Sequence, residues 1–244
     1  MIQLENVSKS FGEQKAVNEV SLSIREGSVF GLLGINGAGK STLLRLMAGI
    51  LRQDSGSIQI GNQDVFNEFE VKQNVFYLSD APYYFPNATL KRMKEFYMSM
   101  YPKFDREGFE MLAEKFELDE SRRIRTFSKG MKRQAFILLA ICTNAAYILC
   151  DEVFDGLDPI VSKVVKDILR REMEMRKLTL VMASHNPREL EDFCDTVGIM
   201  YKGGKLEVIQ RRNQVSEKML PLSIEEIFLS RMEGTDYGIK RTVF

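Results

Sequence analysis

Eight consecutive residues have the types and the spacing of a phosphate-binding loop. Residues 34–41 read G-I-N-G-A-G-K-S, which fits the pattern G-x-x-x-x-G-K-[ST]. The apolar run 29–33 before them predicts a buried strand, and residues 42–47 after them predict a helix with one apolar side. Glycines in such a turn let successive N–H groups point at phosphate oxygens, and the helix N-terminus adds partial positive charge. We therefore expect this loop to bind the phosphates of a nucleotide.

Two side chains of the loop carry specific chemistry. Lys40 is expected to reach the β- and γ-phosphates, and the Ser41 hydroxyl is expected to ligate Mg²⁺. A dinucleotide-binding G-x-G-x-x-G loop fits less well, because its third glycine would fall at Thr42. A chance glycine-rich turn is the other alternative, and the matching strand and helix argue against it. The expected nucleotide-binding residues of the loop are Gly34, Ile35, Asn36, Gly37, Ala38, Gly39, Lys40, Ser41 and Thr42.

A pair of carboxylates, Asp151 and Glu152, follows the apolar run 147–150. Open α/β sheets bind their ligands at the carboxyl ends of strands, and an acidic pair there is costly without a cation. If the phosphate loop lies on a neighbouring strand, Asp151 would hold Mg²⁺ through water. Glu152 would accept a proton from the water that attacks the γ-phosphate. Alternatively, the two carboxylates merely cap the next turn.

Ser128 and Gly130 begin a predicted helix that runs through Ile141. This helix provides a second N-terminus suited to an anion, far in sequence from the first. An anion site without a phosphate of its own suggests the nucleotide of a partner. Taken alone, however, Ser128 is better explained as an ordinary N-cap.

The chain from Ile2 to about Tyr201 resembles the nucleotide-binding domain of ATP-binding cassette (ABC) transporters. Phe127-Ser128-Lys129-Gly130-Met131 stands where that family carries its LSGGQ signature loop, and Gly156-Leu157-Asp158-Pro159 matches its D-loop. The resemblance implies that two such domains pair head to tail. Each signature loop then closes over the ATP bound to the other domain.

The resemblance also implies roles for three further residues. Phe11 would stack on adenine, and Asp158 would help to join the two protomers near the attacking water. His185, the one histidine of the chain, would sense the γ-phosphate and orient the water, while Glu152 remains the base. The local alternatives are that Phe11 packs in the amino-terminal sheet, that Asp158 caps a helix, and that His185 is simply packed or solvated.

The chain departs from the family pattern at three positions. Asp80 stands where the family has a glutamine between the sheet and the helical insertion; it keeps an oxygen for Mg²⁺ but shortens the reach. Lys129 replaces a signature glycine, so that its cation either strengthens closure beside the partner's γ-phosphate or faces solvent. Val153 replaces a proline that commonly follows the catalytic glutamate.

The order of elements predicts an α/β fold. Strands alternate with helices, which favours a mostly parallel sheet, and the pattern between about 80 and 143 is helical. In that part, Asp105 is expected to cap a helix whose apolar face is Phe109, Leu112, Ala113 and Phe116. The predicted strands are 2–7, 20–24, 28–33, 57–60, 147–150, 178–183 and 196–201.

With the resemblance, this pattern implies a P-loop NTPase (RecA-like) core with a mostly parallel sheet, an amino-terminal antiparallel β subdomain and an inserted α-helical subdomain. We expect a single ABC ATPase domain over 1–244. Its core comprises 1–79 and 144–210, and its helical subdomain comprises 80–143 with the signature loop. A short C-terminal extension covers 211–244, in which Ser223 and Glu226 predict a capping box for a helix through Leu229.

Composition excludes several classes of protein. The 244 residues are 44% hydrophobic, which suits a globular domain with a subdomain, and 34 basic residues balance 34 acidic ones, so that no excess charge favours nucleic acid or a membrane surface. The three cysteines form no C-x-x-C pair, which argues against zinc and disulfides and favours a reducing cytosol. The most apolar stretch, 135–150, is shorter than a membrane span, and the first residues lack a basic signal region.

The sequence therefore predicts an ATP-hydrolysing ABC subunit that uses ATP and Mg²⁺. Its expected partners are a second ABC ATPase subunit, identical or homologous, and separate integral membrane permease subunits at the cytoplasmic face of the membrane, most closely as in bacterial exporters. One alternative is a soluble ABC ATPase acting on a ribosome or DNA, against which the balanced charge and the single cassette argue. A P-loop GTPase or kinase is another, but the chain has no N-K-x-D guanine motif.

Overall fold

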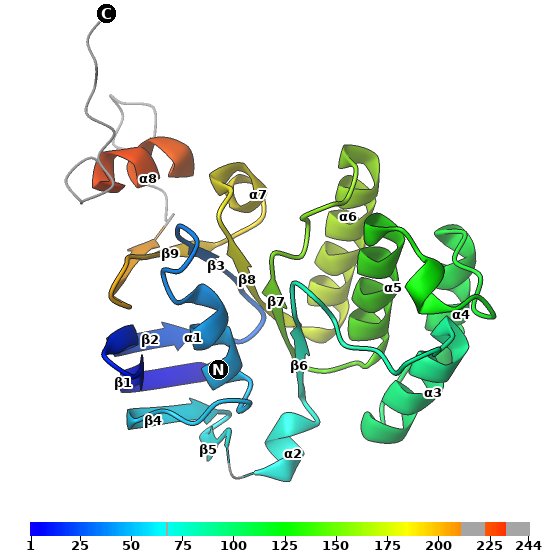
Figure 1. The fold of residues 1–244 in the computed structure, drawn as a ribbon, viewed down its shortest axis with the longest axis horizontal. Coiled ribbons are helices and arrows are strands. Elements are labelled where there is room, and N and C mark those ends of the chain that lie inside the picture. Colours follow the sequence, from blue (N-terminus) through cyan, green and yellow to red (C-terminus); the bar gives the residue numbers. More distant parts are fainter. Residues whose placement is uncertain (67, 211–222, 233–244) are drawn as a thin grey trace, which may run out of the picture.

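The computed structural model describes residues 1–66, 68–210 and 223–232. The first layer is an antiparallel sheet in the order β2-β1-β4-β5. A long hairpin of β1 (Ile2–Phe11) and β2 (Gln14–Ile24) forms one side of it, and β4 (Ser55–Ile60) with the short β5 (Gln63–Asp64) forms the other. Figure 1 shows this sheet beside α1 (Lys40–Met47), which packs its apolar side into the same core.

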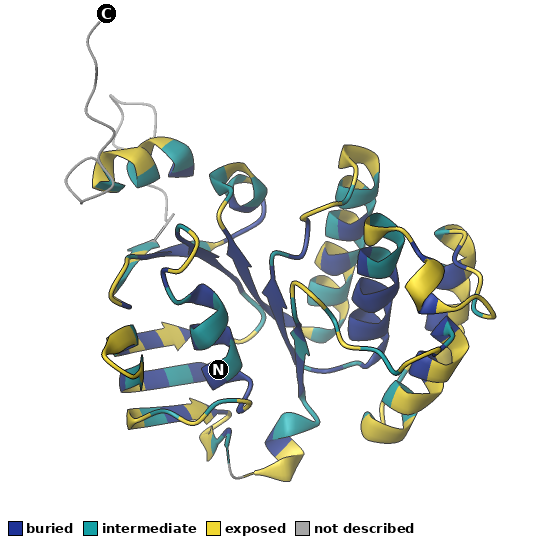
Figure 2. Ribbon diagram, in the orientation of Figure 1, coloured by how far each residue is buried: buried dark blue, intermediate teal, exposed yellow. Residues whose placement is uncertain are grey.

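The second layer is a six-stranded sheet that runs through the middle of the molecule in the order β10-β9-β3-β8-β7-β6. All neighbours are parallel except β10 and β9. The three central strands are buried along their whole length, as Figure 2 shows, because elements cover both faces. Their bounds are β3 (Val29–Leu33), β8 (Thr179–Ser184) and β7 (Tyr147–Asp151), and those of the outer strands are β6 (Val75–Leu78), β9 (Thr196–Met200) and β10 (Leu206–Gln210).

The register of these strands brings their carboxyl ends to one level. Leu33 pairs with Ser184, and Asp151 pairs with Ala183 on the other side of the same strand β8. Leu78 of β6 pairs with Cys150. The loops that follow these four strands therefore leave the sheet at the same edge.

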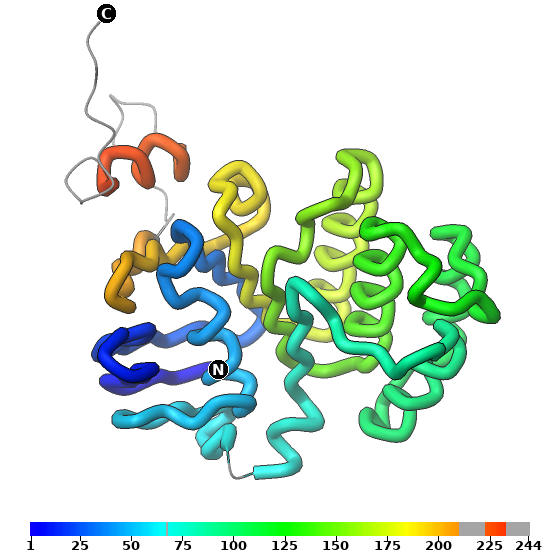
Figure 3. The backbone as a smooth tube through the Cα atoms, viewed as in Figure 1, coloured from blue at the N-terminus to red at the C-terminus, as the bar shows by residue number. Residues whose placement is uncertain are grey.

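The helical subdomain lies on the opposite side of the central sheet from the antiparallel sheet, as the tube in Figure 3 makes plain. Asp105 caps α4 by accepting a hydrogen bond from the Gly108 N–H at 2.9 Å, as predicted, and Ser128 caps α5 by accepting one from Met131 N–H at 3.1 Å. The helices of this part are α3 (Leu90–Met100), α4 (Arg106–Lys115), the 3₁₀ turn η1 (Ile124–Thr126) and α5 (Lys129–Cys142).

The remaining helices connect or flank the strands. The helix that Asp158 caps is α6 (Pro159–Arg176). The predicted capping box at Ser223 and Glu226 opens α8 (Ile224–Met232). Two short helices, α2 (Phe69–Lys72) and α7 (Pro187–Glu191), are the others among the described residues. None of the helices within the described ranges combines the length and apolar character that crossing a bilayer requires.

The main difference from the predicted elements concerns the sheet edges. Strands β6 and β10 were not expected, and the hairpin strands β1 and β2 are longer than the predicted 2–7 and 20–24. These segments are strands because a neighbour supplies hydrogen-bonding partners, and that neighbour lies far away in sequence for β6. Residues 211–222 and 233–244 of the expected C-terminal extension lie outside the described residues.

We expect Phe109→Ala to destabilise the fold by about 3–5 kcal/mol, because it removes a ring that packs in the helical core. Phe109 is 0% exposed, whereas Met111 of the same helix is 69% exposed. Met111→Ala is therefore the matched control, with an expected change within about 0.5 kcal/mol. Urea denaturation followed by circular dichroism measures both; equal effects would contradict the assignment of the core.

Candidate nucleotide site

The phosphate loop joins β3 to α1 and depends on its glycines. Gly39 is the N-cap of α1 with φ of 106°, and Gly37 has φ of 79°, a region that residues with a side chain rarely adopt. A Cβ on Gly39 would also lie 2.0 Å from the Ala16 carbonyl oxygen. The close approach of the amino-terminal hairpin therefore allows only glycine at this position. The arrangement leaves the first N–H groups of α1 at the mouth of the loop.

Lys40 places a buried cation inside this loop. Its Nζ donates hydrogen bonds to the carbonyl oxygens of Gly34 at 2.7 Å and Ile35 at 3.3 Å. It also lies 3.7 Å from Oε1 of Glu152. Burial lowers the pKa of Lys40, and the carboxylates of Glu152 and Asp151 oppose that shift. The structure thus brings the predicted lysine and the predicted acidic pair together from segments that are far apart in sequence.

Asp151 ends β7 as a buried carboxylate. Burial raises its pKa; a hydrogen bond with Ser41 lowers it, and the nearby charges of Asp80 and Glu152 raise it further. The Tyr77 hydroxyl donates a long hydrogen bond of 3.4 Å to Oδ2. A buried carboxylate among other acids is stabilised by a cation, and a hydroxyl with a carboxylate is a donor set that suits Mg²⁺.

The described residues contain no cluster of three His, Cys, Asp or Glu side chains that could hold a metal. Proteins usually bind Mg²⁺ through one or two carboxylates together with substrate phosphates. The side chains of Ser41 and Asp151 therefore fit a metal carried in by a nucleotide.

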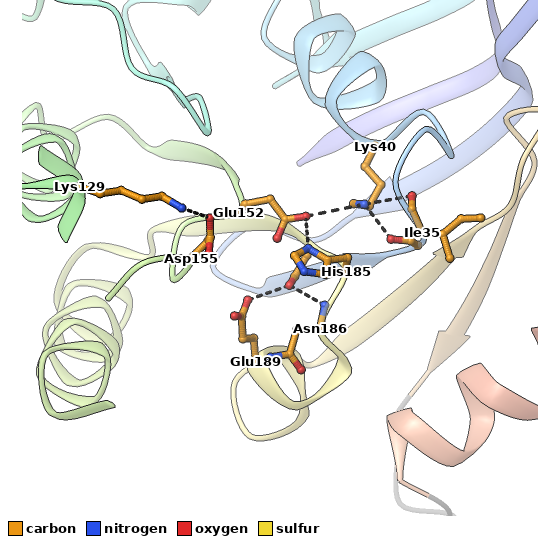
Figure 4. A network of polar contacts seen from close by, with 10 residues as sticks. Ile35, Lys40, Lys129, Glu152, Asp155, His185, Asn186 and Glu189 are labelled. Atoms are coloured by element: carbon orange, nitrogen blue, oxygen red, sulfur yellow. Dashed lines mark hydrogen bonds and ion pairs between the residues drawn. The ribbon is translucent and has the colours of Figure 1, made fainter. Parts of the chain in front are cut away.

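Glu152 is the centre of the polar network in Figure 4. Its backbone has φ of 50°, an uncommon conformation for a residue with a side chain, and its N–H donates to the Ala183 carbonyl oxygen at 2.9 Å. Its Oε1 lies 3.0 Å from Nδ1 of His185. Its Oε2 is buried and has no hydrogen-bond partner in the described part of the chain. One carboxylate oxygen is therefore held by two side chains, while the other has no partner among the described residues.

The turn after β8 holds His185 beside Glu152. Ser184, which is buried, donates a hydrogen bond from its hydroxyl to Glu189 Oε2 at 2.7 Å and accepts one from the Asn186 N–H at 3.0 Å. The residues on both sides of His185 are thereby held (Figure 4). Glu189 was not singled out in the sequence, although the N-cap pattern Asn186-Pro187 could have revealed the short helix α7 that carries it.

Three other expected site residues lie outside this network. Ser128 caps α5, Phe11 is exposed at the end of β1, and Asp158 caps α6 by accepting bonds from the N–H groups of Ile160 and Val161, both at 3.0 Å. In Figure 4 the start of α5, marked by Lys129, and the phosphate loop, marked by Lys40, lie on opposite sides of Glu152. Within one chain, therefore, the signature loop does not reach the phosphate loop.

The segment at Asp80 forms a turn that is held by α5, the helix that begins at the signature loop and is called the signature helix below. Asp80 Oδ1 accepts hydrogen bonds from the Ser79 hydroxyl at 2.9 Å and the Ala81 N–H at 2.8 Å. The buried guanidinium of Arg133 on α5 donates to the carbonyl oxygens of Ser79 at 3.0 Å and Asp80 at 2.8 Å. Sequence reasoning missed Arg133, because a basic residue in an apolar helix carries no signal of the carbonyls that it will meet.

Comparison with known proteins agrees with this geometry. The ABC transporter family matches residues 17–155, more than half of the chain. The ABC transporter ATP-binding protein YtrB of Bacillus subtilis is 32% identical over 82% of this chain and 68% of its own length. The lipopolysaccharide export system ATP-binding protein LptB of Haemophilus influenzae is 32% identical over 83% of this chain and 88% of its own.

Among solved structures, the dimeric post-hydrolysis state of the ATP-binding cassette MJ0796 bound to ADP and Pi has a TM-score of 0.77 at 22% identity. The alignment covers 87% of this chain and 100% of that one, and it shows that the two share a fold. The phosphate loop, the acidic pair at the end of β7 and the family match together establish that this chain is a member of the ABC transporter family, of the ATP-binding type.

Proposed function

We propose that this chain hydrolyses ATP with Glu152 as the general base. The observation that carries the proposal is the Glu152 carboxylate, whose Oε1 lies 3.0 Å from His185 and whose buried Oε2 has no partner in the described chain. A base needs one free oxygen at a defined position, and buried carboxylates are rarely left unpaired without a reason.

In the proposed mechanism, the N–H groups of the loop and the Lys40 ammonium bind the β- and γ-phosphates. Ser41 and Asp151 would hold Mg²⁺, Asp151 through water, and the metal would neutralise charge on the phosphates. Glu152 Oε2 accepts a proton from the attacking water. His185 donates a hydrogen bond to the γ-phosphate and helps to orient that water.

Two further residues are proposed to complete the site. Phe11 offers an exposed ring at the end of β1, on which adenine can stack. Asp80 would supply an additional oxygen to Mg²⁺ from the turn that Arg133 contacts. Because both local hydrogen bonds to the Asp80 carboxylate go to Oδ1, the oxygen that would bind the metal is Oδ2.

We further propose that two chains form the working ATPase, with ATP shared between the phosphate loop of one and the signature loop of the other. Ser128 and Gly130 present the N-terminus of α5, which suits a phosphate, yet they lie across Glu152 from Lys40 in the same chain. Asp158 would join the protomers. A related cassette whose structure is dimeric supports this arrangement.

The proposed partners of this ATPase dimer are separate membrane permease chains. ATP hydrolysis would drive transport through them, in the direction of export. Membership of the ABC transporter family and the similarity to an export-system ATP-binding protein support this proposal. The chain would then act at the cytoplasmic face of the membrane. Residues 80–143 would be a helical subdomain inserted into the core of 1–79 and 144–210, with 211–244 as an extension.

Lys40→Ala should weaken the binding of Mg-ATP on the order of 100-fold, because it removes the cation placed against the phosphates. Isothermal titration calorimetry measures the affinity. Lys91→Ala, at an exposed lysine of α3, is the control and should bind like the wild type. Unchanged affinity in Lys40→Ala would contradict the assignment of the phosphate loop.

Glu152→Gln should retain ATP binding and lose turnover by about 100-fold or more, because an amide keeps the shape but cannot accept a proton. A steady-state phosphate-release assay together with calorimetry separates the two effects. Glu107→Gln, on the exposed side of α4, serves as the control. Hydrolysis at the wild-type rate in Glu152→Gln would remove Glu152 from its role as base.

In the Glu152→Gln background, Mg-ATP should convert a monomer into a dimer, because the shared nucleotide is not cleaved. Adding Ser128→Asp should abolish that dimer by placing negative charge against the γ-phosphate. Ser128→Asn is the matched neutral control, since Asp and Asn are both good N-caps for α5. Analytical ultracentrifugation decides the question: a dimer indifferent to Ser128→Asp would exclude the shared site.

A further inference from the structure

An ion pair joins the signature loop to the segment after the acidic motif within a single chain. The Lys129 Nζ donates a hydrogen bond to Asp155 Oδ2 at 2.7 Å, across 26 residues of sequence (Figure 4). Their side chains are 68% and 48% exposed. Of the two orientations expected for Lys129, towards a partner's phosphate or into solvent, the side chain adopts neither alone: it lies along the neighbouring loop of its own chain.

The contact includes packing as well as charge. A Cβ on Gly156 would lie 3.1–3.4 Å from the Lys129 side-chain carbons Cδ, Cε and Cγ, so that the aliphatic stem of the lysine covers this glycine. A Cβ on Gly130 would lie 3.1 Å from the Gly156 carbonyl oxygen. The signature loop and the D-loop segment therefore touch along several atoms, and the ion pair closes the outer end of this contact.

The contact with Lys129 favours the ionised form of Asp155. The hydrogen bond from Lys129 is the largest of the effects that lower the pKa of Asp155 below its ordinary value. The carboxylate of Asp155 is thus ionised at neutral pH.

We propose that Lys129 is a positioning residue, which binds Asp155 of its own chain and holds the D-loop against the signature loop, rather than contacting the nucleotide of the partner. This inference rests on the proposed shared-ATP dimer. Ser128 immediately precedes Lys129, and Asp158 lies three residues after Asp155. The pair therefore sets the spacing of two groups that must meet the partner chain at the same time.

The ion pair should affect the relative position of the two loops rather than the stability of the fold. Exposed ion pairs contribute little to the free energy of folding, and this pair is exposed on both sides. Closure of the dimer, however, requires the signature loop and the D-loop to be in place at the same time. An ion pair that fixes the position of one loop relative to the other therefore raises the fraction of chains that can dimerise.

A charge swap tests the proposal in the full chain. Lys129→Glu and Asp155→Lys should each lower kcat by about two- to fivefold, with little change in KM for ATP and in the thermal midpoint. Each should also weaken the ATP-dependent dimer in the Glu152→Gln background. The double variant Lys129→Glu with Asp155→Lys restores an opposite pair and should return both readouts to within about twofold of the wild type.

The control is Arg231→Ala, which breaks the exposed pair of Arg231 with Glu207, 3.1 Å long with side chains 54% and 40% exposed, between α8 and β10. It should leave hydrolysis and dimerisation unchanged. A double variant as impaired as Lys129→Glu would overturn the inference, because the cation at 129 itself would then be required at the nucleotide. If all the variants behave like Arg231→Ala, the inference is overturned too, because the pair of Lys129 and Asp155 would then have no effect on hydrolysis or dimerisation.

The two levels of failure are distinguishable. A wild-type chain that neither hydrolyses ATP nor dimerises with it in the Glu152→Gln background would overturn the proposed function, and this inference with it. Normal activity in the wild type combined with either of the contrary results for the swap would overturn only the role of Lys129.

Discussion

The rest of the site depends on one constraint: the parallel strands β3, β7 and β8 end at the same level of the sheet. Leu33 pairs with Ser184 and Asp151 pairs with Ala183, so the loops after β3, β7 and β8 leave one edge of the sheet together. A register shift of one residue would turn every side chain of a strand to the opposite face. Because both faces of these strands are buried, such a shift is strongly disfavoured, and the packing of the core thereby fixes the geometry of the site.

At that edge of the sheet, each buried charge would be costly alone, and opposite charges stabilise one another. Lys40, Asp151 and Glu152 are all largely withdrawn from water, and the opposite charges counter the effect of burial on the pKa of Lys40. Burial without a partner would cost several kcal/mol per ion, by order of magnitude. The left-handed backbone of Glu152 adds local strain, which the surrounding strands must hold in place. The site is therefore built at the expense of local stability, on a rigid sheet.

The signature helix α5 links this edge to the helical subdomain at two points. Through Arg133 it holds the carbonyl oxygens of Ser79 and Asp80, and through Lys129 it contacts Asp155. Both contacts lie within the first turns of the helix whose N-cap is Ser128. A displacement of α5 must therefore act on the turn at Asp80 and on the segment after Glu152 together, because one helix moves as a rigid element.

The sequence by itself determined the features that are local along the chain. The phosphate loop, the acidic pair after an apolar strand, the caps at Asp105, Ser128 and Asp158, and the alternation of strands and helices could all be predicted, because their physical causes lie within a few residues. Only the tertiary structure decided that residues 75–78 and 206–210 form the edge strands β6 and β10. It also decided three side-chain contacts: Tyr77 with Asp151, Arg133 with the carbonyl oxygen of Ser79, and Lys129 with Asp155. These partners lie up to 74 residues apart along the chain. Their meeting depends on how strands pair and helices pack, and no pattern in the neighbouring residues records that choice.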